Sequence, residues 1–211
     1  MTPQYQQHQY VAIIIMGVSG TGKSTLGSAL AHELGFPYIE GDELHPKSNI
    51  DKMSSGIPLT DADREPWLAL IRKTAKESII DERCKHGQSK SLVGVVIACS
   101  ALKKHYRDIL RGRVEPHSVL NSSDSSYESS TSSLPDLRTY FVFISGPREL
   151  LYKRLEARPG HFMKAYMLDS QIAALESPAG EEDVIIVAME DGTEAQLEQV
   201  IEGLKQAGAS L

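Results

Sequence analysis

Cysteine and long hydrophobic runs are scarce in this sequence of 211 residues. Cys84 and Cys99 are its two cysteines, and no CxxC pair is present. A disulfide framework and a cysteine-based zinc site are therefore excluded, and we expect a reducing, cytoplasmic location. The longest apolar runs, VAIIIMGV and VGVVIA, are far too short to span a bilayer, and the start MTPQYQQHQY lacks the apolar core of a secretory signal. We expect no membrane partner.

An excess of basic charge is also missing. The sequence carries 22 Lys and Arg against 28 Asp and Glu, a formal net charge of −6, and its pI is about 5.7. Proteins that bind nucleic acid through phosphate contacts are more often basic, so no nucleic-acid partner is expected. With 41% hydrophobic and 24% charged residues, the composition is typical of one globular domain with a substantial core.

Apolar runs alternate with helical patterns along the chain. Residues 10–17, 36–40, 92–100, 138–145 and 182–189 have the pattern of strands, and the apolar periodicity between them predicts helices. This order indicates βαβ units and an α/β fold with a parallel sheet. We predict a disordered tail over residues 1–9 and a single domain over 10–211. The Ser-rich segment 115–136 is expected to be an exposed, mobile inserted loop, either a neutral spacer or a phosphorylated regulatory loop.

The segment GVSGTGKS, residues 17–24, follows the first strand pattern and precedes a helical one. It matches the phosphate-binding pattern G-x-x-x-x-G-K-[ST] without a gap. Its glycines allow successive N–H groups to turn inward, and the next helix adds a positive N-terminal end. Lys23 can reach the β- and γ-phosphates, and the Ser24 hydroxyl can bind Mg²⁺. The residues expected to hold the triphosphate are Gly17, Val18, Ser19, Gly20, Thr21, Gly22, Lys23, Ser24 and Thr25.

A second polar segment follows the strand pattern at 36–40. The sequence YIEGD places Asp42 at the strand end, where small phosphotransferases of this topology bind the acceptor. A carboxylate there can orient an acceptor hydroxyl and take its proton, so we predict that Asp42 is catalytic. Further along, Asp61 and Asp63 are interpreted as the start of a helix rather than as site residues.

Four blocks carry a family resemblance. GVSGTGKST, GDELHPKSNIDKMSSGIPLTDADREPWL, VIACSALKKHYRDILR and ARPGHFM, in this order, resemble the gluconokinase family, whose members phosphorylate D-gluconate with ATP. The resemblance implies a P-loop NTPase fold of three αβα layers around a parallel five-stranded sheet, similar to shikimate and adenylate kinases, with a mobile lid at about 155–170. It also implies a homodimer. Thr21, Glu40 and the Ser-rich insertion depart from the family pattern.

The resemblance also guides the assignment of the remaining site residues. Gluconate is a carboxylate with a polyol chain, so its site needs cations and hydrogen-bonding groups. Arg107 is our first choice for the carboxylate because a guanidinium binds carboxylates bidentately; Lys103, Lys104 and Arg111 remain alternatives. In related kinases an arginine pair spaced like Arg154 and Arg158 binds adenine and phosphates, so Arg158 is predicted to neutralise the transferring phosphoryl group. The other predicted substrate ligands are His45, Lys52, Ser100, Lys103 and His161, besides Asp42.

Together these features predict an ATP:D-gluconate 6-phosphotransferase that makes 6-phosphogluconate for the pentose phosphate pathway. Its predicted cofactors are ATP and Mg²⁺, and its catalytic residues are Lys23, Asp42 and Arg158. Two alternatives stay open. One is a kinase for another small acceptor, such as a shikimate-like acid or a nucleoside monophosphate. The other is a nucleotide-binding module without turnover.

Overall fold

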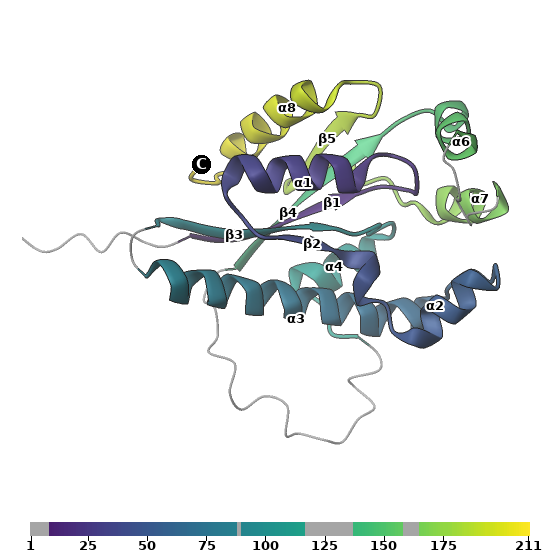
Figure 1. The fold of residues 1–211 in the computed structure, drawn as a ribbon, viewed down its shortest axis with the longest axis horizontal. Helices are drawn as coiled ribbons and strands as arrows, with labels where there is room; N and C mark the ends of the chain where they lie inside the picture. Colours follow the sequence, from purple (N-terminus) through teal and green to yellow (C-terminus); the bar gives the residue numbers. More distant parts are fainter. Residues whose placement is uncertain (1–8, 88–89, 117–136, 158–164) are drawn as a thin grey trace, which may run out of the picture.

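A parallel sheet of five strands forms the centre of the molecule (Figure 1). The computed structural model describes residues 9–87, 90–116, 137–157 and 165–211. All neighbouring strands pair in parallel, in the order β2-β3-β1-β4-β5. The strands are β1 (Gln9–Met16), β2 (Tyr38–Glu40), β3 (Leu92–Ala98), β4 (Leu137–Ser145) and β5 (Val184–Ala188). The predicted α/β fold with a parallel five-stranded sheet is therefore confirmed.

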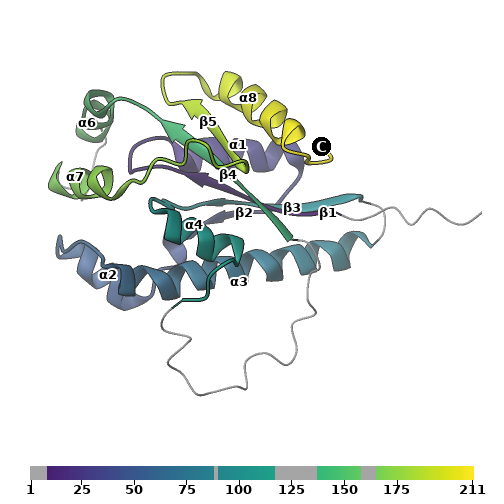
Figure 2. The same cartoon turned by 180° about the vertical axis from the view of Figure 1, so that it is seen from behind.

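Helices cover both faces of this sheet. In Figures 1 and 2, α1 (Lys23–Leu34) and α8 (Thr193–Gln206) lie on one face, and α3 (Asp61–His86) and α4 (Lys104–Arg111) on the other. The shorter elements gather at the end toward which the strands point. They are the 3-10 turn η1 (Gly41–Leu44) and the helices α2 (Lys47–Ser54), α6 (Arg148–Glu156) and α7 (Ala165–Ala174). The three-layer αβα arrangement implied by the family resemblance is thus present.

The unbroken apolar sequence of β1 follows from burial on both sides. Val11, Ile13 and Ile15 belong to the core under α1 and α8, whereas Ile14 and Met16 belong to the core under α3 and α4. Successive side chains of a strand point to opposite faces, so a central strand that is covered twice needs apolar residues at every position. β1 is thereby fixed in the middle of the sheet, and its carboxyl end leads directly into the glycine-rich segment.

Several predicted bounds differ from the structure: β2 begins at Tyr38 rather than at residue 36, and β3 ends at Ala98 rather than at residue 100. Gln9 is the first residue of β1, paired with Leu92, and not the last residue of a tail. Helix α2 was not predicted because Pro46 and Pro58 favoured a loop there; Pro46 instead occupies the N-cap, where a missing N–H costs nothing. Residues 1–8 of the predicted tail, 117–136 of the predicted insertion and 158–164 of the predicted lid lie outside the described residues.

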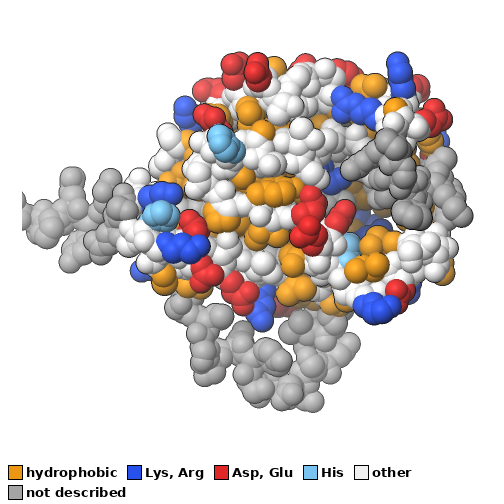
Figure 3. All heavy atoms as spheres, in the orientation of Figure 1, with side chains coloured by type: hydrophobic (Ala, Val, Ile, Leu, Met, Phe, Trp, Pro, Cys, Tyr) orange, Lys and Arg blue, Asp and Glu red, His pale blue; other side chains and the backbone are white. Residues whose placement is uncertain are grey.

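The surface of the described residues carries both signs of charge. Figure 3 shows acidic and basic side chains interspersed over the face seen in Figure 1, without a broad basic area on that face. Within the ranges that the structure describes, no helix is long and apolar enough to cross a membrane.

Candidate active site

The glycine-rich loop joins β1 to α1 at the carboxyl end of the sheet. Gly17, Gly20 and Gly22 have φ angles of 143°, 86° and 102°, a region that L side chains avoid. A Cβ atom at Gly17 would also lie 3.0 Å from the carbonyl oxygen of Ile144. The Thr21 hydroxyl donates to the Val18 carbonyl at 2.9 Å and braces the loop from within. The strand–loop–helix context that the phosphate-binding pattern requires is present.

The polar groups at the start of α1 lie beside the end of β2. Lys23 Nζ donates to the Val18 carbonyl at 3.1 Å, so the ammonium group lies over the loop. The Ser24 side chain lies near the Tyr38 hydroxyl, which donates to Glu40 at 2.7 Å. Burial and the adjacent Glu40 carboxylate raise the pKa of Tyr38. Hydroxyl and carboxylate oxygens, the ligands that Mg²⁺ prefers, therefore meet at this edge.

Asp42 lies in the first turn of η1, directly after β2, and its side chain is exposed. The N–H of Gly17 donates to the Ser100 carbonyl at 3.3 Å, so the loop and the segment after β3 meet at the same edge. Cys99, which precedes Ser100, is buried, and burial raises its thiol pKa to about 12. A thiol with so high a pKa packs rather than reacts. Asp42 and Ser100 thus stand at the edge that carries the loop.

His45 is a packed residue at the end of η1. Its ring stacks on Trp67 with centroids 4.0 Å apart and planes 16° apart, and 8% of the residue is exposed. Burial lowers the pKa of His45, and its Nδ1 lies 3.3 Å from Asn49 Nδ2. The indole N–H of Trp67 donates to the Gly41 carbonyl at 2.8 Å. The two rings fix residues 41–45, which we call the acceptor segment, against α3. The predicted contact of His45 with substrate stays a prediction.

The predicted ligands Lys52 and Lys103 are paired with the first turn of α3. Lys52 Nζ lies 2.5 Å from Asp63, and Lys103 Nζ lies 2.8 Å from both carboxylate oxygens of Asp61. Asp63 completes a capping box with Thr60, which is the N-cap. The interpretation of Asp63 as part of the helix start is confirmed, whereas the two lysines already have carboxylate partners in this structure.

The surroundings of Arg107 favour a structural role, and its predicted contact with the substrate carboxylate stays a prediction. Its side chain is fully buried, and its guanidinium donates to Glu181 at 2.6 Å. It also donates to the backbone carbonyls of Ala101 and Leu102, at 3.1 Å each. Arg111 shares Glu181 at 2.5 Å. Arg107 therefore ties α4 to the segment before β5, and none of its surface is open to a ligand.

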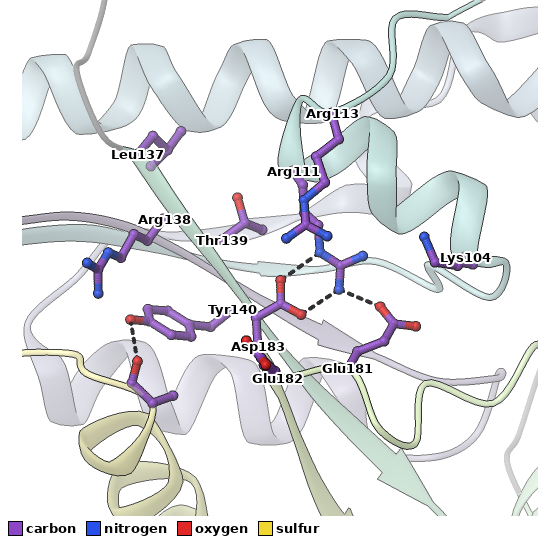
Figure 4. A pocket seen from close by; sticks show the side chains of 11 residues that line it. Lys104, Arg111, Arg113, Leu137, Arg138, Thr139, Tyr140, Glu181, Glu182 and Asp183 are labelled. Carbon is purple, nitrogen blue, oxygen red and sulfur yellow. Dashed lines mark hydrogen bonds and ion pairs between the residues drawn. The ribbon is translucent and has the colours of Figure 1, made fainter.

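Lys104 and Arg111 also lie away from the loop. They line a cavity of about 510 Å³ between α4 and the first residues of β4, shown in Figure 4, where Arg111 meets Asp183. Asp183 precedes β5 and Leu137 begins β4, so this cavity opens at the amino ends of the strands. In a parallel sheet that edge is opposite the one that carries the glycine-rich loop. Neither cation is a candidate for the site.

Two residues at the site were not predicted from the sequence. Arg64, in α3, lies with its guanidinium carbon 6.0 Å from the Tyr106 ring centre, and its charge reaches His45. Among the described residues, no carboxylate pairs with it. Gln171, in α7, accepts a hydrogen bond from the Ser19 N–H of the loop at 2.7 Å. Arg64 lies in the second of the four sequence blocks, next to Asp63, and this pair was interpreted only as the start of a helix. The sequence holds no signal for Gln171.

Arg154 lies between the loop and the segment after β5. Its guanidinium donates to the Met189 carbonyl at 2.7 Å and to the Thr21 carbonyl at 3.4 Å. Arg154 therefore lies beside the loop, and its role in nucleotide binding stays a prediction. Arg158 and His161 lie outside the described residues.

A glycine-rich loop between a central parallel strand and a helix, with the acidic end of β2 beside it, defines a P-loop kinase. A crystal structure of a gluconokinase from Sinorhizobium meliloti is similar, with 37% identity and a TM-score of 0.69 over 95% of this chain and 94% of that one. The APS kinase of Mycobacterium tuberculosis, at 16% identity and a TM-score of 0.59, is alike in fold alone.

Sequence comparison narrows the class. No family model matches the chain. A probable gluconokinase of Schizosaccharomyces pombe is 41% identical over 208 residues, 96% of this chain and 91% of that protein. The gluconokinase of Gluconobacter oxydans is 42% identical over 90% of this chain and 88% of its own length. The thermoresistant gluconokinase of Escherichia coli is 36% identical over 97% and 98%. The chain belongs to the gluconokinase family, which confirms the resemblance found in the sequence.

Proposed function

We propose that the protein is an ATP-dependent gluconate kinase, a phosphotransferase with an alcohol group as acceptor. It transfers the γ-phosphate of ATP to the 6-hydroxyl of D-gluconate and releases ADP and 6-phospho-D-gluconate, which enters the pentose phosphate pathway. The observation that carries the proposal is the intact phosphate loop beside Asp42 at one edge of the sheet, in a chain of the gluconokinase family. We further propose that the protein is cytoplasmic and forms a homodimer.

The loop and the start of α1 hold the triphosphate in this proposal. The inward N–H groups of the loop and the positive end of α1 bind phosphate oxygens, and Lys23 moves from the Val18 carbonyl to the phosphates. The residues described contain no cluster of three or more acidic, histidine or cysteine side chains suited to a metal. That fits Mg²⁺, which is held largely by phosphates and water, with Ser24 as its protein ligand. When bound, Mg²⁺ neutralises charge on the phosphates.

Asp42 is the proposed group for the acceptor hydroxyl. Its exposed carboxylate follows β2, next to the edge where the triphosphate binds. There it orients the 6-hydroxyl toward phosphorus and accepts its proton as the new bond forms. Arg154 would bind the nucleotide from its position beside Thr21, and Arg158 would neutralise the transferring group. Ser100 and His45 are kept as proposed partners of the polyol.

Arg64 replaces Arg107 as the proposed ligand of the gluconate carboxylate. Arg107, Lys52 and Lys103 are each paired with a carboxylate of this chain, whereas Arg64 has no such partner among the described residues. It lies in the same first turns of α3 that pack on the acceptor segment. Its Nη1 donates to the Leu59 carbonyl, and a guanidinium has further N–H groups with which it can bind a carboxylate.

A coupled ADP-release assay with a panel of acceptors tests the proposed function. We expect turnover with gluconate that greatly exceeds turnover with shikimate, AMP, glycerate or no acceptor. Turnover with shikimate or AMP but not with gluconate would assign the enzyme to another acceptor. ATP binding without turnover on any member of the panel would favour a nucleotide-binding module.

A further inference from the structure

A side chain of α7 accepts a hydrogen bond from a backbone N–H group of the phosphate loop. Gln171 Oε1 accepts the backbone N–H of Ser19 at 2.7 Å, and the two residues are 152 positions apart in the chain. Ser19 is the third residue of GVSGTGKS, and both Ser19 and Gln171 are half-buried. N–H groups of such loops form a nest for anions. In this structure a neutral amide oxygen therefore accepts one of the backbone N–H groups of the loop.

Helix α7 reaches the loop as part of a polar network with α6. Asp169, two residues before Gln171 in α7, accepts a hydrogen bond from the Tyr152 hydroxyl at 2.5 Å. It also forms an ion pair with Arg148. Arg154 of the same helix α6 donates to the Thr21 carbonyl of the loop. The loop is thus joined to α6 through Arg154 and to α7 through Gln171. A change at the Gln171 contact therefore affects α7, which is bonded to α6, and α6 in turn contacts the phosphate loop.

The packing next to this contact leaves room for α7 to adjust. Ile172 of α7 and Leu175, which follows the helix, line a cavity of about 140 Å³ together with Val18 and Thr21 of the loop. A well-packed interior resists displacement because it contains few voids larger than a water molecule. This cavity lies between the two elements that the hydrogen bond joins, so the contact can open without breaking a tightly packed interface.

We propose that Gln171 is a positioning residue that holds the Ser19 N–H until a nucleotide phosphate takes its place. The amide oxygen and a phosphate oxygen are both acceptors and cannot share this single donor. A hydrogen bond to a charged oxygen is roughly twice as strong as one to a neutral oxygen, so the phosphate displaces the amide. Phosphate binding thereby releases α7 from the loop, and the departure of the phosphate restores the contact. The inference rests on the proposed function, because it needs a phosphorylated nucleotide at this loop.

Two substitutions with opposite expected signs test the proposal by calorimetric titration of ATP, ADP and AMP. Gln171→Leu removes the competing acceptor, so we expect ATP to bind about three- to tenfold more tightly, the range that one neutral hydrogen bond corresponds to. Gln171→Glu keeps an acceptor and adds a negative charge, so we expect ATP to bind at least about tenfold more weakly. Binding of AMP, which lacks the β- and γ-phosphates, should change little in either variant.

Gln206→Leu is the matched control, because Gln206 pairs with Glu202 on the exposed side of α8. It should leave the affinity for all three nucleotides unchanged. Weaker or unchanged ATP binding by Gln171→Leu would overturn the proposal. A similar loss of ATP affinity in both Gln171 variants would also overturn it, because Gln171 would then support the nucleotide-bound state. The wild-type titration separates this failure from that of the proposed function: wild-type protein that binds ATP and turns over gluconate leaves the function intact whatever the variants do.

Discussion

Replacing Arg107 with methionine separates a structural role of this arginine from a role in substrate binding. Methionine has a similar length but offers no donor, so the change leaves Glu181 with Arg111 as its remaining partner, at 2.5 Å. The carbonyls of Ala101 and Leu102 each lose a donor at 3.1 Å. All of this happens at a side chain that is fully buried, so water cannot easily replace what is lost.

The expected cost follows from these contacts. Breaking a buried ion pair costs about 3–5 kcal/mol, and the retained Arg111 places Arg107→Met near the lower end, at about 3–4 kcal/mol. For a chain of this size each kcal/mol lowers the melting temperature by roughly 2–4 °C, so a fall of roughly 6–16 °C is expected. Urea unfolding followed by circular dichroism measures the free energy, and ADP release by the folded variant should show an unchanged KM for gluconate.

Arg113→Met is the control for the loss of one surface charge. Arg113 is 64% exposed and lies 3.9 Å from Asp108, a separation at which surface pairs contribute about 0–1 kcal/mol. If Arg107→Met were as stable as this control and raised the KM for gluconate, our structural assignment of Arg107 would be refuted and its substrate role restored.

Three further predictions concern the acceptor segment. Asp42→Asn should keep ATP affinity and lower turnover about 10²–10⁴-fold; near-normal ADP release would remove Asp42 from the chemistry. Arg64→Leu should raise the KM for gluconate about 10–100-fold, the effect of one charged hydrogen bond, without a change in ATP affinity; an unchanged KM would assign the carboxylate to another cation. Burial lowers the pKa of His45 from 6.5, so its contribution to folding stability is complete above that pH and is lost as the pH falls below it. Urea titrations should therefore show a smaller loss of unfolding free energy between pH 7 and 5.5 for His45→Phe than for wild type. Equal losses in the two proteins would contradict a lowered pKa of His45.

The fold could be predicted where local sequence decides it. The apolar run of β1 requires a strand covered on both faces, and Gly35 ends α1 in the left-handed conformation that favours glycine. Helix α2 could not be predicted because its stability comes from outside its own sequence. Its buried Asn49 donates to the Asp63 carbonyl of α3 at 2.8 Å. A polar stretch bounded by prolines acquires helical structure here through such tertiary contacts.

The site could be predicted where a motif carries its own geometry, as in the phosphate loop and in Asp42 after β2. It could not be predicted where the partner of a charge decides the role. Arg107 and Arg64 both follow a strand or a turn near the site, and either could bind a carboxylate. Glu181, 74 positions from Arg107, decides between them. No local pattern reveals that pairing, because it exists only after the sheet has brought α4 to the start of β5.

The stack of His45 on Trp67 gives the protein a built-in optical probe. The sequence contains a single tryptophan, so all indole emission comes from a ring that is 2% exposed and bonded to the Gly41 carbonyl beneath the acceptor segment. The fluorescence emission of Trp67 therefore reports the environment of the acceptor segment. Intrinsic fluorescence can therefore follow the occupation of the acceptor side in real time, without a label and without a coupled enzyme.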